Sequence, residues 1–175
     1  MQLAEITAAL QQNYQDLLAW LEQQEESLFA VGPENKWTTG QHVRHLIMST
    51  QMLQKGLMLP KIGLRSMFGK PNRPGREYDA LVARYREKLA QGGTAPKSYE
   101  PDPVTVSEKA ELLDQLKAEG EAMVNSMNKW KEKDLDQYLL PHPLLGKLTI
   151  REMFMFTAYH TRHHLATLEA SYGKA

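Results

Sequence analysis

Apolar side chains recur at helical spacing through most of this chain, and no stretch sustains the alternation of a β-strand. In residues 2–29, leucine and isoleucine stand three, four and seven positions apart. Helical spacing returns in residues 37–59, 107–131 and 149–172, and more briefly in residues 77–91. The pattern predicts four long helices and a shorter one, and glycine or proline follows three of the long helices.

Two of the long helices begin with a capping box. In this motif a threonine and a glutamine or glutamate three residues later satisfy each other's free backbone N–H groups. Thr38 and Gln41 form the first box, and Thr149 and Glu152 form the second. Both precede an apolar helical pattern, so they predict where these helices start.

The segments between the helices are rich in glycine, proline and basic residues. Residues 60–75 and 94–106 are predicted as irregular loops, and so is the segment LLPHPLLGK at residues 139–147. The length of the first two loops indicates a crossover connection, or loops built over a site. We therefore predict an all-α fold, a single four-helix-bundle domain over residues 1–175 with one or two short extra helices.

The composition excludes several classes of function. The charges balance, with 21 Lys+Arg and 21 Asp+Glu, so no overall basic field favours nucleic acid or an anionic membrane. The chain has no cysteine, which removes disulfides, thiolate zinc sites and a cysteine nucleophile. No apolar run approaches the roughly 18 residues that span a bilayer, and MQLAEITAAL lacks the pattern of a secretory signal. We expect a soluble cytoplasmic protein.

Three of the six histidines lie within five residues of the last helix, in AYHTRHHL. On a helical wheel at about 100° per residue, His160 and His164 lie opposite the charged face, whereas His163 lies on the flank. His160 and His164 are spaced i,i+4, a common way for one helix to offer two metal ligands. The alternative is a pair of core histidines bonded to carbonyl groups or water.

The second long helix carries two more histidines, His42 and His45, in QHVRHL. The wheel leaves both available to the interior and slightly favours His42. Four inward-tending histidines on two helices would be costly to bury without a shared purpose. One ligand from this helix would complete a three-histidine site with open positions, the pattern of catalytic metal sites.

Two stretches resemble the DinB/YfiT-like superfamily. KWTTGQHVRHL is similar to its W-[ST]-x-x-[EQ]-x-x-x-H-L signature, and LLGKLTIREMFMFTAYHTRHHLATLE is similar to its closing segment. The resemblance implies a four-helix bundle of the DinB/YfiT type in which His45, His160 and His164 hold a divalent metal ion. A site of three histidines accepts Zn, Ni, Fe or Mn. The resemblance therefore favours His45 over His42. The family often has glutamine three residues after the last ligand, where this chain has Thr167.

The resemblance also implies an activity. Members of this superfamily include metal-dependent transferases that use low-molecular-weight thiols such as bacillithiol and mycothiol, and the family favours a homodimer. With no cysteine of its own, this chain would take such a thiol as cosubstrate and act as an S-transferase on small electrophiles. The alternatives are a metal-dependent hydrolase, a non-catalytic metal-binding bundle of the stress response, and a vestigial site without metal. No acidic residue on the inward face offers a general base, which weakens hydrolysis more than thiol transfer.

Several other residues have a structural as well as a functional interpretation. Trp37 is expected to be a hydrophobic staple or a plug at the bundle end rather than a substrate platform. The wheel places Tyr159 away from the core. His142, between two prolines, is expected in a turn, and a role at the mouth of the site is the alternative. Loops 60–76 and 92–106 are expected to shape the substrate pocket. The basic residues of the first loop are expected on a solvated surface, or at the rim where they attract an anionic substrate: Lys61, Arg65, Lys70, Arg73 and Arg76.

Overall fold

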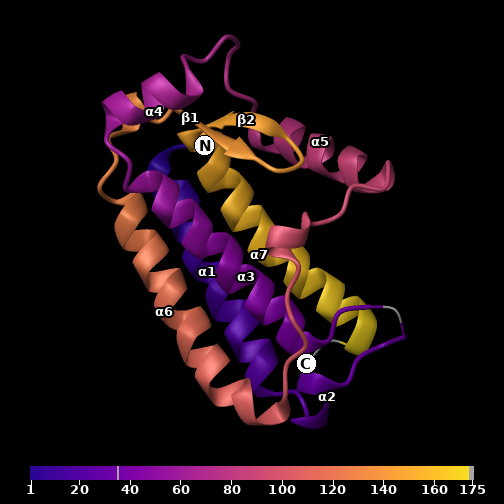
Figure 1. Cartoon of the computed structure of the whole chain (residues 1–175). Coiled ribbons are helices and arrows are strands. Elements are labelled where there is room, and N and C mark those ends of the chain that lie inside the picture. The colour runs from indigo at the N-terminus through magenta and orange to yellow at the C-terminus, as the bar shows by residue number, and fades with distance from the viewer. Residues whose placement is uncertain (35, 174–175) are drawn as a thin grey trace.

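The computed structural model describes residues 1–34 and 36–173, and its main feature is a bundle of long helices (Figure 1). The bundle consists of α1 (Leu3–Glu22), α3 (Thr39–Leu57), α6 (Lys109–Met127) and α7 (Ile150–Tyr172). The expected domain of residues 1–175 also includes residues 35, 174 and 175, which lie outside the described part. The predicted four-helix bundle is confirmed.

The four helices form a ring in which α1 packs against α6 and α7, and α3 packs against the same two helices. α3 and α6 run in the same direction, so the chain returns along the bundle between them (Figure 1). This return passes through α4 (Lys61–Phe68), α5 (Tyr78–Ala90) and two short 3-10 helices (Lys97–Tyr99 and Val106–Glu108). It is the crossover connection that the long loops predicted.

Side chains from all four long helices form the hydrophobic core. Fully buried members include Leu10, Leu17, Leu46, Leu116, Met123 and Phe154. Removal of this apolar surface from water is the main favourable contribution to folding, and it fixes α3 relative to α7. No helix in the two described ranges is both long and apolar enough to cross a membrane.

The helix starts lie where the capping boxes predict them. The Thr38 hydroxyl accepts a hydrogen bond from the N–H of Gln41 at the start of α3. The Thr149 hydroxyl accepts one from the N–H of Glu152 at the start of α7. Each box satisfies backbone donors that have no partner within the helix, so both histidine-bearing helices begin at a defined residue.

Two helical segments differ from the prediction. α1 ends at Glu22 rather than near residue 29, and the apolar residues after it form the separate short helix α2 (Ser27–Ala30). Residues 61–68, predicted as loop, form α4, which begins after Pro60 and ends at Gly69 with a φ of 83°. Proline often precedes a helix and glycine often follows one. The glycine and proline content that led to the loop prediction therefore marks the two ends of this short helix.

The connection before α7, predicted as a loop, is an antiparallel hairpin of β1 (Leu139–His142) and β2 (Gly146–Thr149). Its turn is held by a side chain, since Nδ1 of His142 accepts hydrogen bonds from the N–H groups of Leu144 and Leu145. Strands of four residues are too short for alternation to stand out in a sequence. The prediction that no strand is present is therefore wrong.

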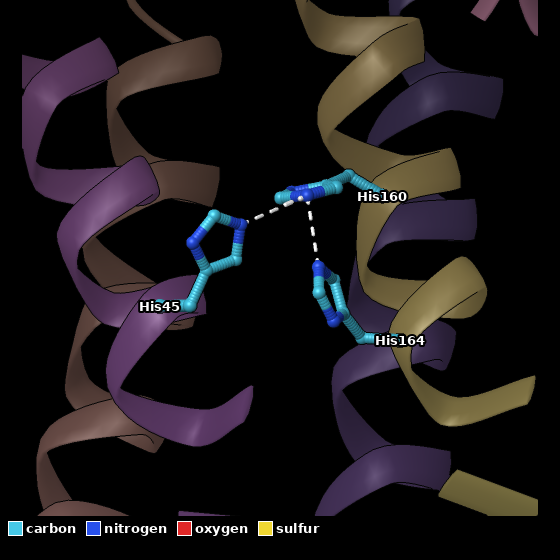
Figure 2. A group of neighbouring side chains, drawn as sticks. All are labelled: His45, His160 and His164. Atoms are coloured by element: carbon cyan, nitrogen blue, oxygen red, sulfur yellow. Dashed lines mark hydrogen bonds between the residues drawn. The ribbon is translucent and has the colours of Figure 1, made fainter. Parts of the chain in front are cut away.

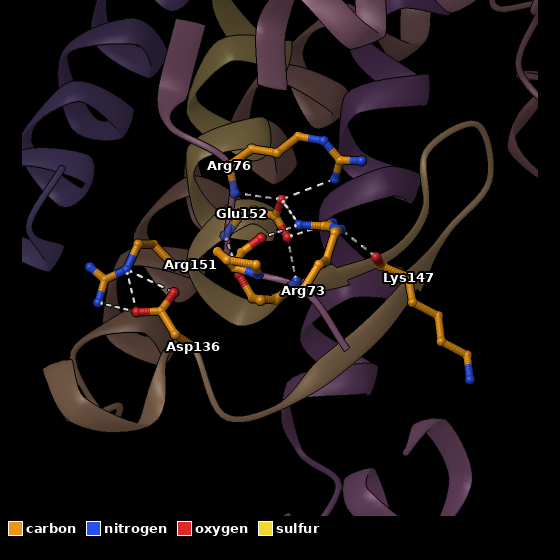
Figure 3. A network of polar contacts seen from close by, with 8 residues as sticks. Arg73, Arg76, Asp136, Lys147, Arg151 and Glu152 are labelled. Carbon is orange, nitrogen blue, oxygen red and sulfur yellow. Dashed lines mark hydrogen bonds and ion pairs between the residues drawn. The ribbon is translucent and has the colours of Figure 1, made fainter. Parts of the chain in front are cut away.

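Two arginines of the basic loop hold Glu152 at the start of α7 (Figure 3). The Glu152 side chain has no exposed surface, and its carboxylate accepts hydrogen bonds from the guanidinium groups of Arg73 and Arg76. Lys61 pairs with Asp134 in the same region. Arg73 and Arg76 therefore pair with a buried carboxylate of the chain itself instead of lying on the expected solvated or anion-attracting surface. Lys61 is exposed, as expected, although Asp134 pairs with it.

Candidate metal centre

Three histidines meet between α3 and α7. His45 projects from α3, and His160 and His164 project from α7 toward it (Figure 2). The Nε2 atoms of His45 and His160 are 3.3 Å apart, and those of His160 and His164 are 3.0 Å apart. One ligand atom from each residue lies within 4.8 Å of the other two, and all three side chains are buried.

The separation of these nitrogens fits one divalent ion. Metal–nitrogen bonds of about 2.0–2.1 Å place two ligand nitrogens roughly 2.9 Å apart at a right angle and roughly 3.3 Å apart at a tetrahedral angle. The separations of 3.3 and 3.0 Å, two of the three in the cluster, lie close to these values. Protons alone do not satisfy the cluster, because Nε2 of His160 faces two other nitrogens and can make only one strong hydrogen bond. The three histidines could therefore hold a divalent metal ion and leave further positions open.

The opposite nitrogen of two of these rings has a partner of its own. Nδ1 of His45 lies 2.7 Å from the carbonyl oxygen of Tyr99, and because a carbonyl only accepts, the proton of His45 is on Nδ1. Nδ1 of His164 lies 2.7 Å from Nδ1 of His42. Such outer contacts leave Nε2 as the ligand atom and fix the orientation of the ring.

The surroundings keep the imidazoles uncharged. Burial lowers the pKa of His160 and His164 well below the ordinary value, and neighbouring imidazoles lower it further. Burial also lowers the pKa of His45, and it lowers that of His42 to about 4. Since only a neutral ring offers a lone pair to a metal, these residues are in the binding form at neutral pH.

A cavity of about 500 Å³ adjoins the three histidines. No aspartate or glutamate lines it in the part of the chain that the structure describes. Most of its wall is apolar, including Leu46, Leu53, Tyr85, Leu89, Pro96, Leu140, Leu144 and Phe156. The cavity therefore suits a small molecule with an apolar body, one end of which reaches the histidine nitrogens.

Both loops that were expected to shape the pocket contribute to its wall. Phe68 comes from the first loop, and Ala95, Pro96 and Tyr99 come from the second. The hairpin contributes as well, although no strand was predicted. Tyr99 also supplies the carbonyl group behind His45. Because this acceptor is a backbone atom, no residue type in the sequence could have indicated it.

The remaining histidines surround the cluster. His42 is buried on the same helix as His45, as the wheel indicated, but its ring contacts the rear nitrogen of His164. His163 is half-buried on the flank of α7, as predicted. His142, predicted in a turn, is instead the last residue of β1, where its side chain holds the turn that follows, and it also lines the cavity. Of these three histidines, only His42 forms a hydrogen bond with the side chain of a candidate ligand.

Two aromatic residues lie elsewhere than predicted. Trp37 is not confined to the bundle end, since its ring lies 4.9 Å from that of His45 and parallel to that of His164, and it lines the cavity. Tyr159, predicted to face away from the core, is 7 % exposed. The wheel assumed one buried face, but α5 packs against α7 as well, and residues 152–161 are all buried.

The comparisons with known proteins agree with this architecture. The chain is similar to a solved structure described as TT2238, a four-helix bundle protein, with 19% identity and a TM-score of 0.55 over 97% of this chain and 99% of that one. At this identity the likeness shows the fold alone. No curated protein matches the chain. A family model described as the DinB superfamily matches residues 9–168, which include both histidine-bearing helices. The chain therefore belongs to the DinB superfamily.

Proposed function

We propose that this protein is a metal-dependent enzyme that transfers a low-molecular-weight thiol to a small electrophile. The observation that carries the proposal is the convergence of three buried imidazole nitrogens beside an apolar cavity. A structural metal site has all its positions filled by the protein and needs no adjoining cavity, whereas three ligands leave room for a substrate. The proposed ligands are His45, His160 and His164.

A divalent ion, when bound, supplies positive charge that three neutral ligands do not cancel, and so lowers the pKa of a thiol or of water. The chain's own residues hold the ion, enclose the substrate and exclude water. Trp37 covers one side of the histidine cluster, and the apolar wall receives the electrophile. In the reaction, sulfur bonds to the electrophilic carbon, the leaving group departs with the bonding electrons, and the thiol proton passes to solvent.

The side chains around the cavity favour thiol transfer over hydrolysis. Hydrolysis benefits from a carboxylate base beside the metal, and the described cavity wall contains none. A thiol needs less assistance, because its pKa of about 8.5 is already close to neutral. Since the chain has no cysteine, the thiol would arrive as a cosubstrate.

Thiol consumption tests this proposal. Metal-loaded protein is incubated with chlorodinitrobenzene and either bacillithiol or mycothiol, and the loss of free thiol is followed. We expect the wild type to exceed the spontaneous rate at least about tenfold, equivalent to about 1.4 kcal/mol of transition-state stabilisation. Chelation of the metal, or the substitution His164→Ala, should return the rate to the spontaneous value because the thiol is then no longer acidified.

The matched control is Glu87→Gln, which alters an exposed ion pair with Arg84 on α5 and should leave the rate unchanged. Thiol consumption that persists in metal-free His164→Ala protein would contradict the assignment of the reaction to this site. Cleavage of an ester or amide without any thiol would identify a hydrolase instead. Bound metal with neither activity would identify a non-catalytic metal-binding bundle.

A further inference from the structure

We propose that His42 is a positioning residue of the metal centre, which accepts a hydrogen bond from His164 and so fixes the ring of that ligand. The inference rests on the proposed function and concerns a residue outside the three ligands. His42 lies on α3, three residues before His45, and its Nδ1 is 2.7 Å from Nδ1 of His164 on α7.

The direction of this hydrogen bond follows from the part assigned to His164. A neutral imidazole that binds a metal through Nε2 has its proton on Nδ1. That N–H donates across the 2.7 Å contact, so Nδ1 of His42 accepts and the proton of His42 is on Nε2. His45 is held in the same way, with the carbonyl oxygen of Tyr99 as the acceptor.

The surroundings of His42 leave little water that could take the place of its hydrogen bond with His164. Its side chain is 8 % exposed and that of His164 is 5 % exposed, so little water reaches the pair. The His42 ring stands edge-on to His164 and to Trp37, with centroid separations of 5.0 and 5.5 Å. The contact also joins α3 to α7, the two helices that carry the three candidate ligands.

His42 is not placed as a fourth ligand. Its Nδ1 meets the rear of the His164 ring, whereas the nitrogens that converge belong to His45, His160 and His164. Loss of His42 should therefore weaken metal binding without removing a ligand. Loss of an outer-shell hydrogen bond to a metal ligand typically costs about 10–100-fold in affinity.

Two substitutions at His42 distinguish the effect of its hydrogen bond from the effect of its side-chain volume. His42→Leu keeps an apolar body without an acceptor, whereas His42→Asn places Oδ1 as many bonds from the backbone as Nδ1 and can accept from His164. Zn²⁺ affinity is measured by competition with a chromophoric chelator. We expect His42→Leu to bind about 10–100-fold more weakly and His42→Asn to stay close to the wild type. The control His163→Leu removes a neighbouring imidazole that no hydrogen bond joins to the three ligands among the described residues, and it should bind as the wild type does.

Equal affinity of the wild type and His42→Leu would overturn the positioning role. So would equal losses in His42→Leu and His42→Asn, because His42 would then be a ligand or a folding residue. Wild-type protein that binds no Zn²⁺ would overturn the metal site itself, which distinguishes that failure from failure of His42 alone.

Proton positions give a measurement that needs no variant. NMR of Zn²⁺-loaded wild-type protein with isotope-labelled histidine reports which ring nitrogen carries the proton. We expect the proton on Nδ1 of His164 and on Nε2 of His42. A proton on Nδ1 of His42 would overturn the proposal.

Discussion

Glu152 is a single carboxylate that joins three parts of the chain around one negative charge. It accepts hydrogen bonds from the Arg73 guanidinium and from the backbone N–H groups of Arg76 and Thr149 (Figure 3). Burial raises the pKa of this carboxyl, but the hydrogen bonds from Arg73, Thr149 and Arg76 outweigh it and lower the pKa below its ordinary value. Glu152 therefore ties the loop after α4 and the end of the hairpin to the start of α7.

We expect Glu152→Gln to lower the free energy of unfolding by about 2–3 kcal/mol at neutral pH. Removal of one partner from a fully buried ion pair costs about 3–5 kcal/mol. The loss expected here is smaller, because Arg73 and Arg76 are partly exposed. Folding lowers the pKa of the Glu152 carboxyl. Its stabilising effect is therefore fully present above the pKa of about 4.3 in the unfolded chain, and it is lost as the pH falls through the lower pKa of the folded state. Urea unfolding should therefore show a smaller difference from the wild type in acid than at neutral pH.

Glu87→Gln is the matched control, because Glu87 forms an exposed ion pair with Arg84. It should leave the free energy of unfolding close to that of the wild type, because exposed ion pairs contribute little to stability. Equal losses in the two variants, or a loss in Glu152→Gln that does not depend on pH, would count against the network around Glu152.

That His160 and His164 face the interior could be predicted, because the helical period and the charged face of α7 determine it. The wheel could not separate His42 from His45, since both face inward, and only the motif favoured His45. The hydrogen bond of His42 to His164 depends on the distance and rotation of α3 against α7. A pattern within one helix does not contain that information.

At the scale of secondary-structure elements, the start of α3 is closely packed near the candidate site. A Cβ atom on Gly40 would lie 2.3 Å from Cγ2 of Val104 and 2.8 Å from the carbonyl oxygen of Phe29. Only glycine lets α2 and the crossover segment approach this closely, two residues before His42.

Gly40→Ala should lower the free energy of unfolding by about 1–3 kcal/mol, because the backbone of Phe29 cannot move aside as a flexible side chain can. The expected fall in Tm is roughly 2–4 °C per kcal/mol, measured by thermal unfolding. Gly63→Ala in α4 is the control, since its Cβ would meet only Pro60, at 3.4 Å, and it should be neutral or stabilise by up to about 1 kcal/mol. A Gly40→Ala protein as stable as the wild type would contradict this packing.

The long helices could be predicted because many residues repeat one spacing, and because α3 and α7 also begin with capping boxes. The hairpin could not be predicted, because its short strands depend on the turn held by His142 and on the burial of Leu140 and Leu148. The burial of Tyr159 depends on α5, which lies far from α7 in the sequence. Local periodicity thus predicts elements, but not which of their faces a neighbour covers.

At the scale of the whole molecule, the candidate site joins two helices that are not consecutive in the chain. The crossover connection, α6 and the hairpin lie between α3 and α7 in the chain (Figure 1). The three histidines therefore meet only in the folded bundle. A metal ion held by His45, His160 and His164 would cross-link α3 and α7, and it would stabilise the folded state because the unfolded chain lacks the site.

Whether these histidines bind a metal is decided by the metal content of the purified protein. Protein prepared without chelators is analysed for first-row metals beside the variants His45→Ala, His160→Ala and His164→Ala. We predict about one equivalent of Zn, Ni, Fe or Mn per wild-type chain, and loss of that metal in each variant, because two remaining imidazoles hold a divalent ion poorly. Less than about a tenth of an equivalent in the wild type, or an unchanged metal content in the variants, would contradict the three-histidine site.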